Sequence, residues 1–207
     1  MPIPWNDETR RGKKLLVYFE PSLAKTVWGG TLDACLKEFN LLSRNNRLGV
    51  TLERSKEAPV KGGGGAHVSV TTGNGKIEFD YDGGKDSALL IGISMHGRTF
   101  LPQRDGTIEK AYVYLPATPL ISTPQGSRPV GHAVMKLIAV HEFVHASGLL
   151  NSDHNKEDLF QASPAIEYGT RGAGEDKAKG ERAGRATWMP PLFLSPTTAK
   201  AIADNWK

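Results

Sequence analysis

This 207-residue sequence has only one cysteine, no long apolar run and no leader-type start. Cys35 is its one cysteine, so no disulfide can form within the chain. No stretch approaches the roughly 18 consecutive apolar residues of a membrane-spanning helix. Residues 1–20 lack the apolar core of a secretory signal peptide. These absences predict synthesis in the cytoplasm and no membrane partner. A phage-associated protein, or export by another route, remains compatible with them.

Concentrated charge is also scarce. The formal net charge is +4, and the basic residues are scattered apart from one denser run in residues 171–185. A nucleic-acid-binding domain gathers its Lys and Arg on one face or along one helix, so we expect no nucleic-acid partner. The hydrophobic share of 39% and the charged share of 23% are typical of a globular chain long enough for one domain.

Hydrophobic periodicity predicts an α+β (mixed α/β) domain. The apolar run at residues 15–19 predicts a buried strand. Residues 32–43 place apolar side chains, Cys35 among them, at helical spacing behind Thr31 as the N-cap. Short apolar or alternating segments predict further strands at residues 48–55, 66–72, 76–81, 87–94, 97–101 and 108–115.

A long apolar helix dominates the second half of the sequence. Residues 130–147 are apolar on most sides, which predicts a helix in the core, and Gly148 is suited to end it. Turn-forming residues at 122–129 predict a loop before this helix. The glycine- and charge-rich residues 169–186 predict a mobile surface loop. Residues 197–206 predict a closing helix that begins after a Ser-Pro pair.

The long helix carries the one strong chemical signal, HEFVHASGLLNSDH at residues 141–154. Residues four apart on a helix lie about 40° apart on one face, so His141 and His145 can present their imidazoles to one ion. Glu142 stands beside the first ligand without having to bind the metal. A bound zinc ion lowers the pKa of a coordinated water toward about 7, and a carboxylate can then take its proton. The pattern therefore predicts a Zn²⁺ site with Glu142 as general base.

Two histidines do not complete a zinc site, so a third ligand is needed. Gly148 lets the chain leave the helix and return toward the metal. Asn151, a neutral amide, is a poor zinc ligand, whereas His154 and Asp153 are both chemically suitable. We favour His154 as the third ligand and keep Asp153 as the alternative, either as a ligand or as a residue that orients one. A buried Glu142 without a metal or another partner would be unfavourable, which also supports a metal site.

These residues resemble the metzincin zinc peptidases of the matrixin-like, bacterial or phage type. HEFVHASG matches the family's HExxHxxG pattern, and ATWMPP at residues 186–191 resembles its Met-turn, with Met189 as the methionine beneath the metal. Residues 97–116 resemble the edge strand and partner strand that precede the active-site helix. The resemblance covers roughly residues 97–207.

The resemblance implies a twisted sheet, a buried active-site helix and a C-terminal helix after the Met-turn. It implies a single catalytic domain over residues 1–207, with an N-terminal subdomain at 1–148 and a C-terminal one at 149–207. A protein or peptide substrate would lie extended along the edge strand near residues 97–101.

The sequence also departs from the family pattern. Asn151 stands at the usual position of the third ligand, and His154 comes three residues later. The segment from His154 to Met189 is longer than in a compact matrixin. A cysteine switch is absent, so any latency must arise in another way.

The leading functional hypothesis is a zinc-dependent endopeptidase that uses a metal-bound water and Glu142. Two other functions stay open: a zinc-stabilised, non-catalytic binding or virion-associated protein of the same fold, and a zinc hydrolase that acts on a non-peptide amide such as a cell-wall crosslink. Glu142 distinguishes the endopeptidase from the non-catalytic binding protein, because a purely structural site needs no carboxylate there.

The remaining candidate residues carry weaker signals. His132 lies nine positions before His141, so it points about 180° away on the same helix and is expected at the surface or as a cap. His96 is expected in a surface turn, and His67 has no evident partner in the sequence. Tyr168 is a candidate for stabilising an oxyanion, as a tyrosine does in some metzincins.

Overall fold

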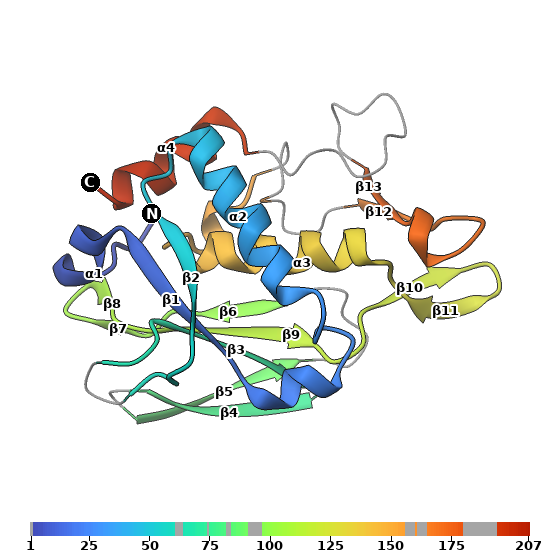
Figure 1. Ribbon diagram of the computed structural model, residues 1–207, viewed down its shortest axis with the longest axis horizontal. Helices are drawn as coiled ribbons and strands as arrows, with labels where there is room; N and C mark the ends of the chain where they lie inside the picture. Colours follow the sequence, from blue (N-terminus) through green and yellow to red (C-terminus); the bar gives the residue numbers. More distant parts are fainter. Residues whose placement is uncertain are drawn as a thin grey trace.

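The computed structural model describes residues 2–60, 64–73, 75–81, 84–90, 97–155, 160, 165–179 and 194–207. Its centre is a five-stranded sheet in the order β2-β1-β3-β9-β6 (Figure 1). The strands span Thr51–Ser55 (β2), Lys14–Phe19 (β1), Val68–Gly73 (β3), Ala111–Pro116 (β9) and Arg98–Phe100 (β6). The first four are mutually parallel, and β6 pairs antiparallel with β9, which makes β6 an edge strand.

Two helices cover one face of this sheet. The helix α2 (Leu32–Asn46) packs on β2, and α3 (His132–Ala146) packs on β9 and β6. The two helices also pack on each other, where the rings of Phe39 and Phe143 meet edge to face at 6.4 Å. Both rings are fully buried. Because the apolar residues of α3 face the sheet on one side and α2 on the other, this helix lies inside the core.

Smaller elements surround this centre. Four two-stranded hairpins consist of β4 (Gly75–Tyr81) with β5 (Gly84–Leu90), β7 (Gln103–Arg104) with β8 (Thr107–Ile108), β10 (Leu120–Thr123) with β11 (Gly126–Pro129), and β12 (Ala165–Glu167) with β13 (Lys177–Lys179). The short helices are α1 (Asp7–Gly12), η1 (Pro21–Lys25), η2 (Asn151–Asp153) and η3 (Ala173–Glu175), and α4 (Pro196–Asn205) ends the chain. None of the helices in the described part of the chain has the length and hydrophobicity needed to cross a lipid bilayer.

The α+β class and the main elements are confirmed. The helix expected at residues 130–147 is α3, buried along most of its length, and Gly148 follows it with a φ of +113°. The closing helix is α4, with Ser195 accepting a hydrogen bond from the Thr198 N–H as its N-cap. The predicted strands correspond to β1 to β6 and β9, except that residues 91–94 lie outside the described part.

One local prediction is confirmed in position only, and two are wrong. Thr31 is the N-cap residue of α2, but its side chain makes no capping hydrogen bond; its hydroxyl instead pairs with His132 Nδ1 at 3.2 Å. Residues 122–129 belong to the β10–β11 hairpin, since Thr123 pairs with Gly126 and leaves only a two-residue Pro-Gln turn. Residues 169–179, expected in a mobile loop, contain η3 and β13. Residues 180–186 lie outside the described part.

Candidate metal centre

Three histidines from two elements converge at the C-terminal half of α3. His141 and His145 lie one turn apart on the helix, and His154 follows η2 on the chain that returns from Gly148. The Nε2 atom of His154 lies 3.2 Å from Nε2 of His141 and 3.0 Å from Nε2 of His145. All three potential ligand atoms lie within 4.8 Å of one another. The predicted ligand set is therefore brought together.

The geometry of the three imidazoles fits a metal ion. Zinc–nitrogen bonds are about 2.0–2.1 Å long, so two nitrogens of a tetrahedral zinc site lie about 3.3 Å apart. The separations at His154 are close to this value. Three nitrogen ligands leave the fourth tetrahedral position free, as catalytic zinc sites do. Imidazole also binds copper, iron and nickel, so the arrangement indicates a transition-metal site rather than one particular ion.

A backbone carbonyl orients the most buried of the three histidines. His145 is 4% exposed, and its Nδ1 lies 2.8 Å from the carbonyl oxygen of Leu149. When Nδ1–H donates to this carbonyl, the lone pair of Nε2 faces the other two histidines. Burial and the neighbouring His141 lower the pKa of His145 to about 3. The ring is therefore neutral at physiological pH, the state that a ligand requires.

His154, and not Asp153, faces the histidines of α3. Oδ2 of Asp153 accepts a hydrogen bond of 2.8 Å from the Leu150 N–H and so closes the η2 turn that delivers His154. Burial lowers the pKa of His154, although the Asp153 carboxylate acts in the opposite direction. Asp153 therefore closes the turn that immediately precedes His154. The side chain of Asn151 is exposed.

A phenylalanine that the sequence did not point to packs against all three imidazoles. Phe160 is fully buried, and its ring centroid lies 5.2 Å from that of His141, 4.5 Å from that of His145 and 4.7 Å from that of His154. The resemblance to the metzincins implied that Met189 would lie beneath the metal as its apolar support, but Met189 lies outside the described residues. No spacing rule links an aromatic residue in this segment to the helix, so only the folded chain reveals the contact.

Glu142 is buried between α3 and the edge strand. Its side chain is 3% exposed, and the Thr99 hydroxyl donates a 2.7 Å hydrogen bond to Oε2. A Cβ atom at Gly97 would lie 2.6 Å from Cγ of Glu142. Burial raises the pKa of the Glu142 carboxyl to about 8, and the hydrogen bond from Thr99 lowers it. A dication bound beside it would also lower this pKa.

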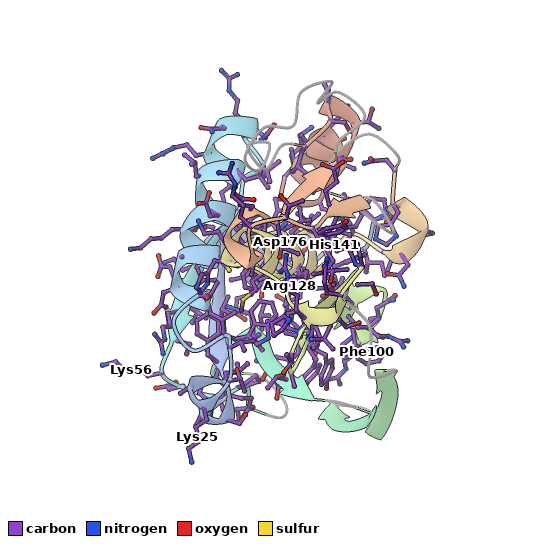
Figure 2. The ribbon with its side chains drawn as sticks, turned by 90° about the vertical axis from the view of Figure 1, so that its right-hand side faces the viewer. Lys25, Lys56, Phe100, Arg128, His141 and Asp176 are labelled. Atoms are coloured by element: carbon purple, nitrogen blue, oxygen red, sulfur yellow. The ribbon has the colours of Figure 1, made fainter. Side chains whose placement is uncertain are left out.

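A partly buried ion pair between Arg128 and Asp176 contacts the other end of α3 (Figure 2). Asp176 has no exposed side-chain surface and receives two hydrogen bonds from Arg128, of 2.6 and 2.8 Å. Its carboxylate also accepts from the N–H of Gly131, the N-cap of α3, at 2.9 Å and from the N–H of Gly169 at 2.8 Å. The buried position of Asp176 differs from that of Lys25 and Lys56, whose side chains point outward into solvent (Figure 2).

The C-terminal end of α3 is held by both ends of the chain. The indole N–H of Trp5 donates to the carbonyl of Ala146 at 2.9 Å, and that of Trp206 donates to the carbonyl of Ser147 at 3.0 Å. The N–H of Ile3 donates to the carbonyl of Gly148 at 2.8 Å. A helix leaves its last carbonyls without intrahelical partners, and these donors satisfy them. A Cβ at Gly148 would lie 2.5 Å from the Ile3 carbonyl oxygen, so this close approach requires glycine.

The other candidate residues lie away from the three imidazoles or outside the described part. His132 is exposed, as expected. His67 does have partners: Nδ1 accepts from the Leu16 N–H at 2.9 Å, and the ring meets Trp5 edge to face. Tyr168 is 38% exposed and lines a hollow of about 410 Å³ beside β10 and β11. His96 lies outside the described residues.

Comparison with known proteins does not identify a family for this chain. No family model matches the chain, and no curated protein matches it.

Proposed function

We propose that this protein is a zinc-dependent endopeptidase of metzincin type. One observation carries the proposal: three imidazole Nε2 atoms converge on one point, and the residue after the first ligand is a buried glutamate on the same helix. A closed structural zinc site has four protein ligands and needs no carboxylate beside them. The HExxHxxG pattern and the C-terminal helix α4 agree with the resemblance described above.

In this proposal His141, His145 and His154 would hold the ion. A zinc ion held there would supply Lewis-acid chemistry for the scissile carbonyl and for water. Glu142 takes one proton from the attacking water, whose oxygen forms the new bond to the carbonyl carbon. Glu142 then gives that proton to the departing amine as the C–N bond breaks. The products are a carboxylic acid and an amine, and Glu142 is regenerated.

The edge strand β6 provides the place for the substrate. Arg98–Phe100 uses one side of its backbone to pair with β9, and β6 is the last of the described strands at this side of the sheet. An extended peptide can continue the sheet by pairing with an exposed edge. Thr99 of this strand touches Glu142, so a peptide bound along β6 lies next to the general base. We therefore propose a protein or peptide substrate held in extended form.

Metal analysis and a cleavage assay test the proposal together. Purified protein should bind about one zinc ion, measured by inductively coupled plasma mass spectrometry after dialysis against zinc. It should cleave members of a diverse peptide library, read by mass spectrometry, and the E142Q variant should bind zinc but lose cleavage. Zinc binding without cleavage of any peptide would contradict the proposal and favour the binding-protein alternative. Cleavage of cell-wall crosslinks alone would favour the non-peptide amidase.

A further inference from the structure

The carboxylate of Glu142 is held by two residues of the edge-strand segment. The Thr99 hydroxyl lies 2.7 Å from Oε2 and 3.1 Å from the backbone carbonyl oxygen of the same glutamate. At Gly97 the side chain of Glu142 lies against the strand backbone, since an added Cβ would be 2.9 Å from both Cδ and Oε1. One residue thus binds the carboxylate, and the other provides the space that it occupies.

The positions of Gly97 and Thr99 follow from the strand. Residues two apart in a strand face the same side, and α3 packs on this side of β6. The intervening residue, Arg98, is exposed. A side chain larger than hydrogen at position 97 would meet Cγ of Glu142 at 2.6 Å, well inside van der Waals contact. The observed position of the Glu142 side chain therefore leaves room only for glycine at position 97.

We propose that Gly97 and Thr99 form a two-point clamp that positions Glu142 for its reaction, with Thr99 as the positioning residue. The inference rests on the proposed function of Glu142 and goes beyond it by assigning residues outside the zinc motif. A glutamate side chain has several rotamers, and holding it in one removes the freedom that would misplace its carboxylate. A misplacement of about 1 Å in a reacting group can reduce a rate by about 100-fold.

The clamp also connects Glu142, the proposed general base, to β6, the strand along which we propose that the peptide binds. Thr99 contributes its side chain to Glu142, while its backbone belongs to the edge along which the peptide would bind. A peptide that pairs with β6 therefore binds the strand that carries Thr99, the residue of the clamp that donates to the carboxylate. The binding of the peptide and the positioning of Glu142 would therefore depend on the same strand, β6.

Variants at position 99 test the clamp. In T99V the side chain keeps its shape and loses the hydroxyl, and we expect kcat to fall about 10- to 100-fold, with KM and bound zinc unchanged. T99S restores the hydroxyl and should stay within about threefold of the wild type. T107V is the matched control, because Thr107 donates only to the Arg104 carbonyl in the β7–β8 turn. Unchanged kcat in T99V, or a T99S variant as slow as T99V, would overturn the inference.

Crystal structures of the zinc-loaded wild type and of T99V test the clamp without turnover. We expect the Glu142 carboxylate to contact Thr99 in the wild type and to shift or adopt several rotamers in T99V. An unmoved carboxylate in T99V would overturn the inference even in an active enzyme. An inactive wild type would contradict the proposed function, and the pair of structures would still decide whether the clamp exists.

Discussion

His154 is the one imidazole of the centre that comes from outside α3. It lies 3.0 and 3.2 Å from the two helical histidines, whereas Asp153 binds the Leu150 N–H. We therefore expect H154A to lose most of its bound zinc, because only two ligands remain. D153A should keep most of its zinc and show somewhat weaker binding, since the η2 turn loses a hydrogen bond. Plasma mass spectrometry of the dialysed proteins checks the ranking. The reverse order would move the third ligand to Asp153.

Phe160 supplies an apolar neighbour to all three imidazoles, and its removal should loosen the metal centre. In F160L the site keeps apolar bulk and loses the flat ring that contacts the histidines. We expect zinc affinity to fall by about 10-fold, the lower end of the range for residues that support metal ligands. Competition with a fluorescent zinc chelator measures this. F100L, a change of the same kind in β6, is the control and should keep wild-type affinity; an equal loss in both variants would mean a general packing effect.

The sequence pointed to the three converging histidines and to Glu142, but not to the residues that contact them. His141, Glu142 and His145 follow from helical spacing, and His154 from the chemistry of the residues after Gly148. Thr99 and Gly97 lie more than forty positions before Glu142, and no periodicity relates a strand residue to one side chain of a helix that packs on it. Contacts of that kind depend on the packing of whole elements, which local patterns do not encode.

At the scale of elements, α3 depends on the carboxylate at its N-terminal end. Asp176 binds Arg128 and the N–H of Gly131, and a negative charge at this end also favours the helix dipole. We expect D176N to lower the free energy of unfolding by about 2–3 kcal/mol, less than for a fully buried pair because Arg128 is 26% exposed. E175Q changes the adjacent, partly exposed carboxylate and should have an effect below about 0.5 kcal/mol. Urea unfolding checks both; equal effects would contradict this role.

The contribution of Asp176 should also depend on pH. Burial raises its pKa, but hydrogen bonds from Arg128, Gly169 and Gly131 outweigh burial and bring the pKa below the ordinary value. The unfolded chain therefore binds this proton more readily than the folded one. The stabilisation is complete above the unfolded pKa of about 3.9 and is lost as the pH falls through the lower folded-state value. The difference in the free energy of unfolding between wild type and D176N should therefore become smaller below about pH 4. A difference that stays constant with pH would contradict the lowered pKa of Asp176.

Elements with strong periodicity were predictable, and those held by distant partners were not. The apolar runs of β1 and α3 determine both the type and the burial of these elements. The segment at residues 169–179 is rich in glycine and charge, which predicts a mobile loop, yet it is ordered around Asp176 by Arg128 from β11. The partner lies 48 residues earlier in the sequence, so the pairing has no local signature.

At the scale of the whole molecule, the two ends of the chain act together on the end of α3. Trp5 and Trp206 each donate an indole hydrogen bond to a carbonyl there. W5F and W206F keep a large ring and lose the donor, so each should cost about 1–3 kcal/mol through an unsatisfied carbonyl. The double variant should depart from additivity, because neighbouring carbonyls of one helix end are affected. Thermal unfolding of the zinc-free wild type, the two single variants and the double variant completes this double-mutant cycle. Strictly additive losses of stability would mean that the two contacts act independently.

The same arrangement brings residues 3 and 205 together, since the Asn205 amide donates to the Ile3 carbonyl at 3.3 Å (Figure 1). The carbonyl of Gly148, three residues beyond the ligand His145, binds the N–H of Ile3. A polyhistidine affinity tag fused next to residue 2 or residue 207 would therefore begin close to the loop that carries the candidate ligand His154. Its imidazoles compete for the ion at a high effective concentration, on the order of millimolar, so a tagged protein reports the metal stoichiometry of the tag together with that of the fold.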